Sequence, residues 1–262
     1  MVDVLIENGV VITMDKERRI VGEEESDGAV AIEGDRIVDV ATTRELKDKY
    51  KTDRVIDAKN KVVMPGLIDC HAHSLNMFCT NEHGLNNDYV YSHLLRRAAS
   101  EEDFYIQSLQ ASLERIRCGT TCGMNIVEML DSVYASRWAE AAEEAGVKNI
   151  IAVGYFPSDP LEAYLKTAEE FIKKWHGKAK GRIQAQVSPG WVGGRGVADE
   201  RGPTYYRPSL SADVYVPPEP TDEEVAYTAR QGRELRALME KYKIRMHTHC
   251  AQYDIEFIKK RS

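Results

Sequence analysis

The feature that most constrains the fold of this chain is the stretch 62–73, Val-Val-Met-Pro-Gly-Leu-Ile-Asp-Cys-His-Ala-His. Apolar and β-branched residues around a turn-forming Pro-Gly pair predict a short buried strand. Alternate side chains of a strand share a face, so we expect His71 and His73 to point the same way. Two such imidazoles can bind one divalent metal, preferably zinc, with iron as the alternative. Asp69 is expected on the same face, where a carboxylate can orient a ligand histidine.

A His-x-His pair alone is a weak signal, because polar residues at a strand end give the same pattern without binding metal. The longer string Pro-Gly-x-Ile-Asp-x-His-x-His, at 65–73, is more specific. It resembles the first barrel strand of the amidohydrolase superfamily, and within it the cytosine-deaminase-like and triazine-hydrolase-like branch. The resemblance implies an α/β fold of the (β/α)8 TIM-barrel type.

Composition is that of a globular enzyme. The chain has 262 residues and a formal net charge of −7, with lysines and arginines dispersed. No basic stripe favours nucleic acid as a partner, and no polybasic tail favours a membrane. Neither a signal peptide nor an apolar span of about 18 residues is evident, so we expect a cytoplasmic protein. The five cysteines are odd in number and scattered, which argues against a disulfide framework.

Residues 1–60 are predicted to form a small β-sheet unit. Short β-type runs alternate with turn-forming residues, and Glu33-Gly34-Asp35 is typical of a hairpin loop. A short polar helix is expected over 45–50. The resemblance implies that this segment is the N-terminal portion of a β-sandwich accessory domain beside the barrel.

From residue 61 to 262 the pattern changes to strands alternating with longer helices, which indicates βαβ units and a parallel sheet. The resemblance makes this segment the N-terminal part of a metal-dependent amidohydrolase barrel. The strand at 62–73 is followed by expected strands at 120–127, 147–153, 182–190 and 244–250, and by expected helices at 101–117, 132–145, 161–175 and 221–242. For the first of these helices, the spacing of the apolar residues predicts a buried face made of Phe104, Ile106, Leu109, Leu113 and Ile116.

Two loops are candidates for substrate contact. The long loop after the first histidine pair contains His83, and loops at the carboxyl ends of barrel strands concentrate substrate contacts. A long insertion at 191–219 contains Trp191 and Arg195, which would suit a flat heterocyclic substrate. The alternatives are a solvated loop histidine and an oligomer contact.

The remaining metal ligands are expected on later strands. In binuclear members of the superfamily a lysine or glutamate on the fourth strand bridges two metals, and neither occurs between Ile183 and Trp191, so one metal is expected. The resemblance makes His249 the third ligand, because the family's ligand is followed three residues later by a catalytic glutamate. Gln252 occupies that position, and a neutral amide can hydrogen-bond a substrate but cannot act as a general acid. Regular alternation also puts His247 on the face of His249, which leaves His247 as the alternative ligand.

The resemblance implies hydrolysis of a non-peptide C–N bond by metal-activated water, in a deaminase or chlorohydrolase type of enzyme with a small, heterocyclic substrate. Only five of the eight barrel strands are recognised, and the family's ligands on strands six and eight have no counterpart. The first hypothesis is therefore the N-terminal part of such a hydrolase, acting as a homo-oligomer or with a complementing C-terminal segment. The alternative is a catalytically incomplete or non-catalytic ligand-binding or interaction protein of the same fold.

Overall fold

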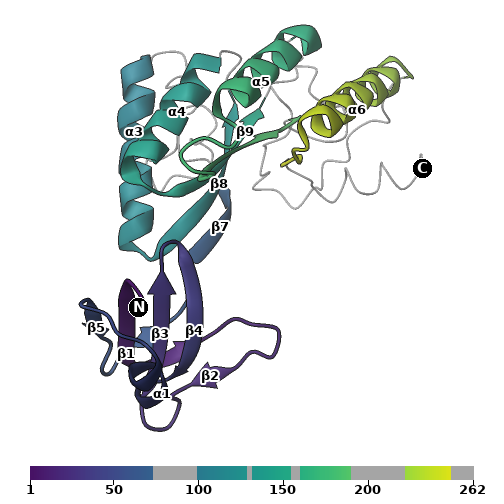
Figure 1. Ribbon diagram of the computed structural model, residues 1–262. Helices are drawn as coiled ribbons and strands as arrows, with labels where there is room; N and C mark the ends of the chain where they lie inside the picture. Colours follow the sequence, from purple (N-terminus) through teal and green to yellow (C-terminus); the bar gives the residue numbers. More distant parts are fainter. Residues whose placement is uncertain (73–98, 129–131, 155–159, 190–221, 249–262) are drawn as a thin grey trace, which may run out of the picture. The chain divides into compact units, whose positions relative to one another are not determined.

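The computed structural model describes residues 1–72, 99–128, 132–154, 160–189 and 222–248. The chain divides into two compact units, Met1–Gly66 and Leu67–Ser262, which are described one at a time (Figure 1).

The first unit is a six-stranded sheet built around one long strand, β1. β1 pairs antiparallel with β2 and β3 and parallel with β5 and β6, and β3 pairs antiparallel with β4. The elements of this unit are β1 (Val4–Ile12), β2 (Ile20–Val21), β3 (Gly28–Glu33), β4 (Arg36–Thr42), α1 (Thr43–Lys49), β5 (Val55–Asp57) and β6 (Val62–Val63). The side chains of β1 alternate between buried and half-buried, as expected of a strand with one face on a core.

Local sequence explains the turn and the helix of this unit. The β3–β4 connection is the predicted hairpin, and Gly34 takes a positive φ of 59°, which glycine adopts without steric cost. The predicted short helix is α1. Thr42 caps it by accepting a hydrogen bond from the backbone of Glu45, whose carboxylate accepts one from the backbone N–H of Thr42.

The second unit contains a parallel sheet in the order β10-β9-β8-β7. Its elements are β7 (Leu67–Ala72), α3 (Glu101–Arg117), β8 (Thr120–Glu128), α4 (Ser132–Ala145), β9 (Lys148–Gly154), α5 (Leu161–Trp175), β10 (Ile183–Val187) and α6 (Asp222–Tyr242). Strands and helices alternate, which confirms the predicted α/β class and parallel sheet. Figure 1 shows α3, α4 and α5 beside one another against the sheet.

The core of the second unit lies between the helices and the sheet. Trp138 of α4, Phe171 of α5 and Ile151 of β9 are fully buried in one apolar cluster. Gly119, which precedes β8, has a φ of 82°, a conformation that allows the chain to leave α3 and enter the next strand at once. Tyr164 of α5 is fully buried, and its hydroxyl lies 3.0 Å from the carbonyl oxygen of Val153, at the end of β9.

The predicted apolar face of α3 is wrong at three of its five positions. Phe104 is buried and Leu109 is half-buried, but Ile106, Leu113 and Ile116 are 50%, 48% and 43% exposed. The buried face also carries small and polar side chains, namely Gln107, Ser108, Ala111 and Ser112. Contacts with α4 and β8, which the periodicity of the helix does not specify, decide which positions of α3 are buried.

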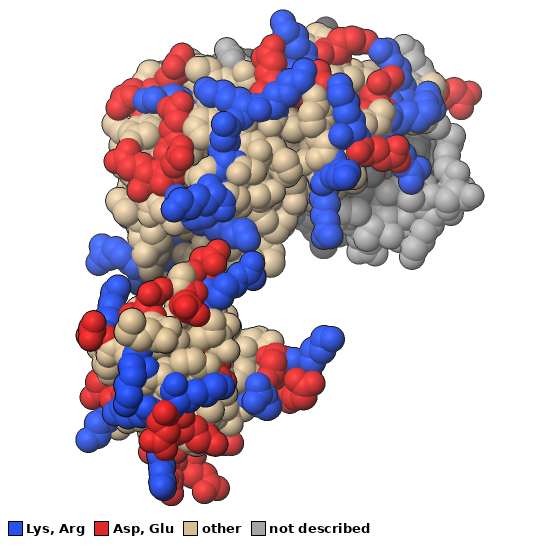
Figure 2. All heavy atoms as spheres, in the orientation of Figure 1, with Lys and Arg blue, Asp and Glu red and all other residues tan. Residues whose placement is uncertain are grey.

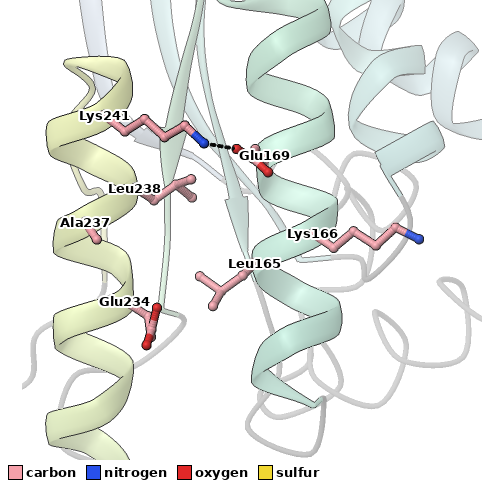
Figure 3. Close-up of a pocket in the computed structure, with 7 residues that line it drawn as sticks. All are labelled: Leu165, Lys166, Glu169, Glu234, Ala237, Leu238 and Lys241. Carbon is pink, nitrogen blue, oxygen red and sulfur yellow. Dashed lines mark hydrogen bonds and ion pairs between the residues drawn. The ribbon is translucent and has the colours of Figure 1, made fainter.

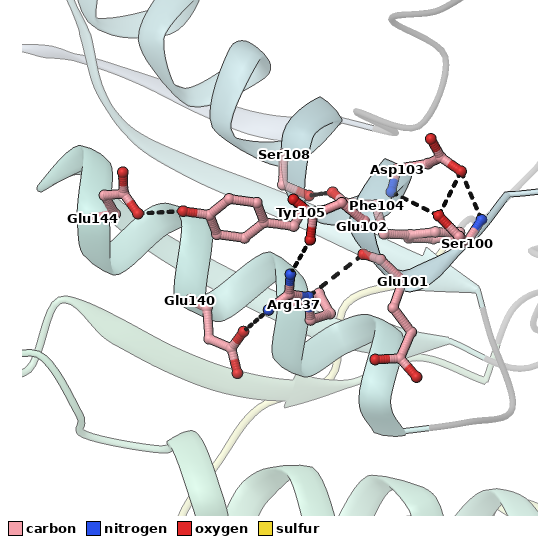
Figure 4. Close-up of polar contacts among 10 residues, drawn as sticks. All are labelled: Ser100, Glu101, Glu102, Asp103, Phe104, Tyr105, Ser108, Arg137, Glu140 and Glu144. Atoms are coloured by element: carbon pink, nitrogen blue, oxygen red, sulfur yellow. Dashed lines mark hydrogen bonds and ion pairs between the residues drawn. The ribbon is translucent and has the colours of Figure 1, made fainter.

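Polar contacts join α3 to α4 (Figure 4). Arg137 of α4 donates to the carboxylates of Glu102 on α3, at 2.6 Å, and of Glu140 on α4, at 2.7 Å. The guanidinium carbon also lies 4.7 Å from the ring centre of Tyr105, whose hydroxyl bonds to Glu144. Hydrogen bonding to Glu140 raises the pKa of Arg137 above its usual value. Ion pairs and hydrogen bonds thus connect α3 to α4.

A groove of about 260 Å³ lies between α5 and α6 (Figure 3). Leu165 and Leu238 are among its apolar lining residues, and Lys241 of α6 donates to Glu169 of α5 at 2.7 Å. The hydroxyl of Tyr242 donates to the same carboxylate oxygen at 2.7 Å. Lys241 first, then Tyr242 and Lys173, lower the pKa of Glu169 from 4.5 to about 2.

We expect Glu169→Gln to lower the urea midpoint of unfolding at pH 7. Because the folded-state pKa of Glu169 is depressed, its stabilising contribution is complete above about pH 4.5 and disappears as the pH falls toward 2. The difference between wild type and variant should therefore shrink from pH 5 to pH 3. Glu240→Gln is the matched control, because Glu240 pairs with Arg236 in its own helix at 3.4 Å. A difference that grows on acidification would contradict the prediction.

Acidic and basic side chains are intermingled on the face of each unit that Figure 2 shows. Among the described helices, none is both long enough and apolar enough to cross a membrane.

Candidate metal centre

The strand that sequence analysis placed at the centre of the site is β7, and His71 lies near its carboxyl end. The side chain of His71 is exposed. His73, its predicted partner ligand, lies outside the described residues, so the common orientation of the two rings remains a prediction.

The register of β7 against β8 shifts between Asp69 and Ala72. Asp69 pairs with Gly123 and Ala72 with Asn125, so three steps along β7 correspond to two along β8. The carboxylate of Asp69 lies 3.2 Å from the guanidinium of Arg115 on α3. The role of Asp69 as the carboxylate that orients a ligand histidine stays a prediction.

The second histidine of the described site, His247, lies beside β10, at the edge of the sheet opposite to β7. Met246 forms a parallel bridge with Val187 of β10, and the backbone N–H of His247 donates to the carbonyl of Val187 at 2.9 Å. Within the described residues, the predicted fifth strand is represented by this single bridge. Nε2 of His247 lies 2.9 Å from Nδ1 of His71, with the rings 5.0 Å apart and nearly perpendicular.

This contact shows that the parallel sheet is curved. Strands neighbour each other at about 4.8 Å, so four strand spacings in a flat sheet would separate the segment at Met246 from β7 by about 19 Å. Two imidazole side chains cannot span that distance. The meeting of His71 and His247 therefore requires that the sheet curls toward them, as it does in a βα-barrel.

The chemistry of this pair fits one metal ligand and a supporting histidine. Two nitrogens bound to one tetrahedral zinc at about 2.0–2.1 Å lie about 3.3–3.4 Å apart. The separation of 2.9 Å is shorter and is a normal hydrogen-bond distance. A ligand histidine commonly bonds through its second ring nitrogen to a neighbouring polar group. The contact between Nδ1 of His71 and Nε2 of His247 is compatible with this arrangement.

The other predicted site residues lie outside the described residues: His73, His83, Trp191, Arg195, His249 and Gln252. Within the described ranges, no group of three or more His, Cys, Asp or Glu side chains could hold a metal ion. The described fourth strand, β10, has the sequence Ile-Gln-Ala-Gln-Val and thus offers no bridging lysine or glutamate.

Sequence reasoning missed the polar cluster behind β7. Arg115 of α3 bonds to Asn125 of β8 at 2.9 Å, and Asn125 bonds to Asn149 of β9 at 2.7 Å. Both asparagines are fully buried. The one sequence signal that could have pointed to this cluster is Gly123, since a glycine inside a strand often marks the close approach of another group.

Fold and site together define a class: an α/β protein of the βα-barrel type with histidines meeting at the carboxyl edge of a curved parallel sheet. The profile of the Amidohydrolase family matches residues 62–261, and the chain belongs to this family. A profile of the bacterial imidazolonepropionase-like composite domain matches residues 28–50.

Two curated relatives are deaminases. The chain is 33% identical over 196 residues to 5'-deoxyadenosine deaminase of Methanosarcina mazei, covering 72% of this chain and 42% of the relative. It is 32% identical over 196 residues to 5-methylthioadenosine/S-adenosylhomocysteine deaminase of Carboxydothermus hydrogenoformans, covering 71% of this chain and 42% of the relative. The chain therefore spans less than half the length of these relatives.

Solved structures of the same type confirm the fold. A mutant of atrazine chlorohydrolase TrzN from Arthrobacter aurescens TC1, complexed with zinc and atraton, has a TM-score of 0.70 at 19% identity, covering 95% of this chain and 53% of that one. Escherichia coli guanine deaminase has a TM-score of 0.67 at 18% identity, covering 99% of this chain and 55% of that one. At these identities the likeness concerns the architecture alone.

Proposed function

We propose that this chain carries the N-terminal part of a metal-dependent hydrolase that acts on a non-peptide C–N bond of a small heterocyclic substrate. The observation that carries the proposal is the meeting of His71 and His247 across the curved sheet, in a chain of the Amidohydrolase family. Barrel enzymes hold their reacting groups at the carboxyl ends of the strands, and the position of His71 near the end of β7 supports the proposal.

The proposed metal ligands are His71, His73 and His249, all through imidazole nitrogen. Neutral imidazole suits zinc, which the TrzN complex contains, and it also suits iron. A divalent cation held there would lower the pKa of a bound water toward about 7 and polarise the substrate. His247 would hold the ring of His71 through Nδ1, and the proposed metal contact of His71 is through Nε2.

Gln252 is the proposed catalytic residue, and its neutral side chain limits the part it can take in proton transfer. The amide can donate to or accept from a ring nitrogen of the substrate, but it has no proton to transfer near neutral pH. Protonation of the leaving group would therefore depend on another group. We assign Gln252 to substrate orientation.

An aminated purine is the proposed substrate class, because the deaminases at 33% and 32% identity are named for adenine nucleosides. The proposed substrate contacts are His83, Trp191 and Arg195. A chlorinated or alkoxylated triazine is the second candidate, favoured by the TrzN complex with atraton. The same arrangement without turnover, a ligand-binding protein, is the alternative from a different class.

The segment 1–60 is proposed as part of a β-sandwich accessory domain and 61–262 as the barrel portion, with the insertion at 191–219 contributing to binding or to an oligomer. A cytoplasmic location, and assembly as a homo-oligomer or with a complementing C-terminal segment, complete the proposal.

The test is zinc content and ammonia release. The purified chain, loaded with zinc, is incubated with 5'-deoxyadenosine, guanine and atraton, and ammonia and methanol are measured. We expect about one zinc per chain and ammonia release from an aminopurine, both absent in the matched variant His71→Ala. Methanol from atraton would favour the triazine alternative. Zinc and ligand binding without product would favour the binding protein, and zinc content unchanged in His71→Ala would refute the site.

A further inference from the structure

The carboxylate of Asp69 connects a helix to the backbone of the proposed metal ligand. One oxygen, Oδ2, lies 3.2 Å from Nη2 of Arg115 on α3. The other, Oδ1, accepts a hydrogen bond from the backbone N–H of His71 at 3.3 Å. The pairing of β7 with β8 shifts register between Asp69 and Ala72, so the connection holds the strand where its regular pairing is interrupted.

The guanidinium of Arg115 is held deep in the layer between α3 and the sheet. The side chain is 13% exposed, and burial lowers the pKa of the guanidinium. Nη2 donates to Oδ1 of Asn125 at 2.9 Å, and Asn125 in turn donates to Asn149 at 2.7 Å. A buried ion pair often stabilises a fold no better than apolar residues of the same size. We therefore expect this cluster to matter more for the geometry of β7 than for stability.

Gly123 leaves the space that the guanidinium occupies. A Cβ at this position would lie 2.7 Å from Nη1 and 3.1 Å from Cζ of Arg115, closer than real contacts allow. Gly123 is also the residue of β8 that pairs with Asp69. Arg115 of α3, Gly123 of β8 and the carboxylate of Asp69 thus lie together. Asp69 is two residues before His71, the proposed ligand.

We infer that Arg115 is a positioning residue that acts through Asp69 to fix the backbone of His71 and thereby to aim its imidazole. The inference rests on the proposed function in one respect, namely that His71 binds metal. In this proposal Arg115 contacts Asp69 and has no contact with metal or substrate.

The test measures zinc affinity by competition with a chromogenic chelator, on the whole chain. We expect Arg115→Met and Asp69→Asn each to weaken zinc binding by about 10- to 100-fold, as changes beyond the metal ligands typically do. The double variant should be no weaker than the weaker single variant, because both changes break one connection. Arg115→Lys, which keeps the charge, should recover part of the affinity.

Gly123→Ala keeps the test decisive if loss of a buried charge prevents folding. The atoms that a new Cβ would meet belong to the end of a flexible side chain, so the guanidinium can move aside while the fold is kept. Its zinc affinity should fall as in Arg115→Met. Ser112→Ala is the matched control on the buried face of α3, since no hydrogen-bond partner for its Oγ is found in the described part of the chain. It should bind zinc as wild type does.

A second readout does not involve metal. In the zinc-free chain, the 15N shifts of the imidazoles report the hydrogen bond between His71 and His247, and we expect this signature to be lost in Arg115→Met and Gly123→Ala. Wild-type zinc affinity and unchanged imidazole shifts in these variants, with zinc binding abolished in His71→Ala, would overturn the positioning role alone. Zinc binding insensitive to His71→Ala would instead refute the proposed metal site, whereas the imidazole shifts would still test the connection.

Discussion

Replacing His249 with alanine is expected to abolish tight zinc binding, and replacing His247 is expected only to weaken it. His249 is the proposed ligand. His247 contacts His71 at 2.9 Å, a hydrogen-bond distance, so it is placed to support a ligand. We expect a loss of about 10-fold or more in His247→Ala, within the range typical of groups behind a metal ligand, and a larger loss in His249→Ala.

The two variants serve as controls for each other, because they remove the same side chain two positions apart in one segment. Zinc affinity is measured by chelator competition, and folding is checked by far-UV circular dichroism. The reverse order, with His247→Ala the more damaging, would show that the described pair itself provides two ligands. The ring nitrogens of His247 and His71, 2.9 Å apart, would then need to move to about 3.3–3.4 Å, the separation of two nitrogens bound to one zinc.

The largest effect on stability is expected from Trp138→Ala. Trp138 of α4 is fully buried in the cluster between the helices and the sheet. Truncating a buried aromatic side chain to alanine typically costs about 3–5 kcal/mol, from lost burial and from the cavity left behind. Since single domains are stable by about 5–15 kcal/mol, this variant should be close to unfolded at 37 °C. Urea unfolding followed by circular dichroism measures the change.

Trp138→Phe is the matched control. It keeps an aromatic ring in the core and removes the indole N–H, for which the described residues offer no hydrogen-bond partner. Loss of an unpaired donor carries little penalty, so we expect a cost well below that of the alanine variant. Equal losses in the two variants would mean that the ring does not stabilise the core by packing.

Local sequence was sufficient to predict most of the elements. The helix α5 begins and ends where its pattern indicated, Leu161–Trp175, and Gly119, Gly146 and Gly177 take the positive φ angles expected after helices. The amphipathic pattern of α5 reflects a helix with one face on the core and the other in water. The same reasoning failed at three positions of α3, because the contacts with α4 and β8 decide which face of this helix is buried.

The site itself was only partly predictable. The string at 65–73 predicted His71 as a site residue, since two histidines on one strand after a Pro-Gly turn are a local pattern. No local pattern revealed that the pairing of β7 with β8 shifts register between Asp69 and Ala72, that Asp69 lies against Arg115, or that His247 lies against His71. Each of these depends on the pairing of strands far apart in the chain.

By itself, the sequence determined the family, the alternation of strands and helices, and the identity of the histidines, because these depend on residue types and short spacings. The tertiary structure alone decided which side chains meet. Curvature of the sheet brought His71 to His247 over 176 positions of sequence, and the fold brought Arg115 of α3 to Asp69 of β7. Register and curvature arise from contacts between distant segments, which periodicity within a segment cannot specify.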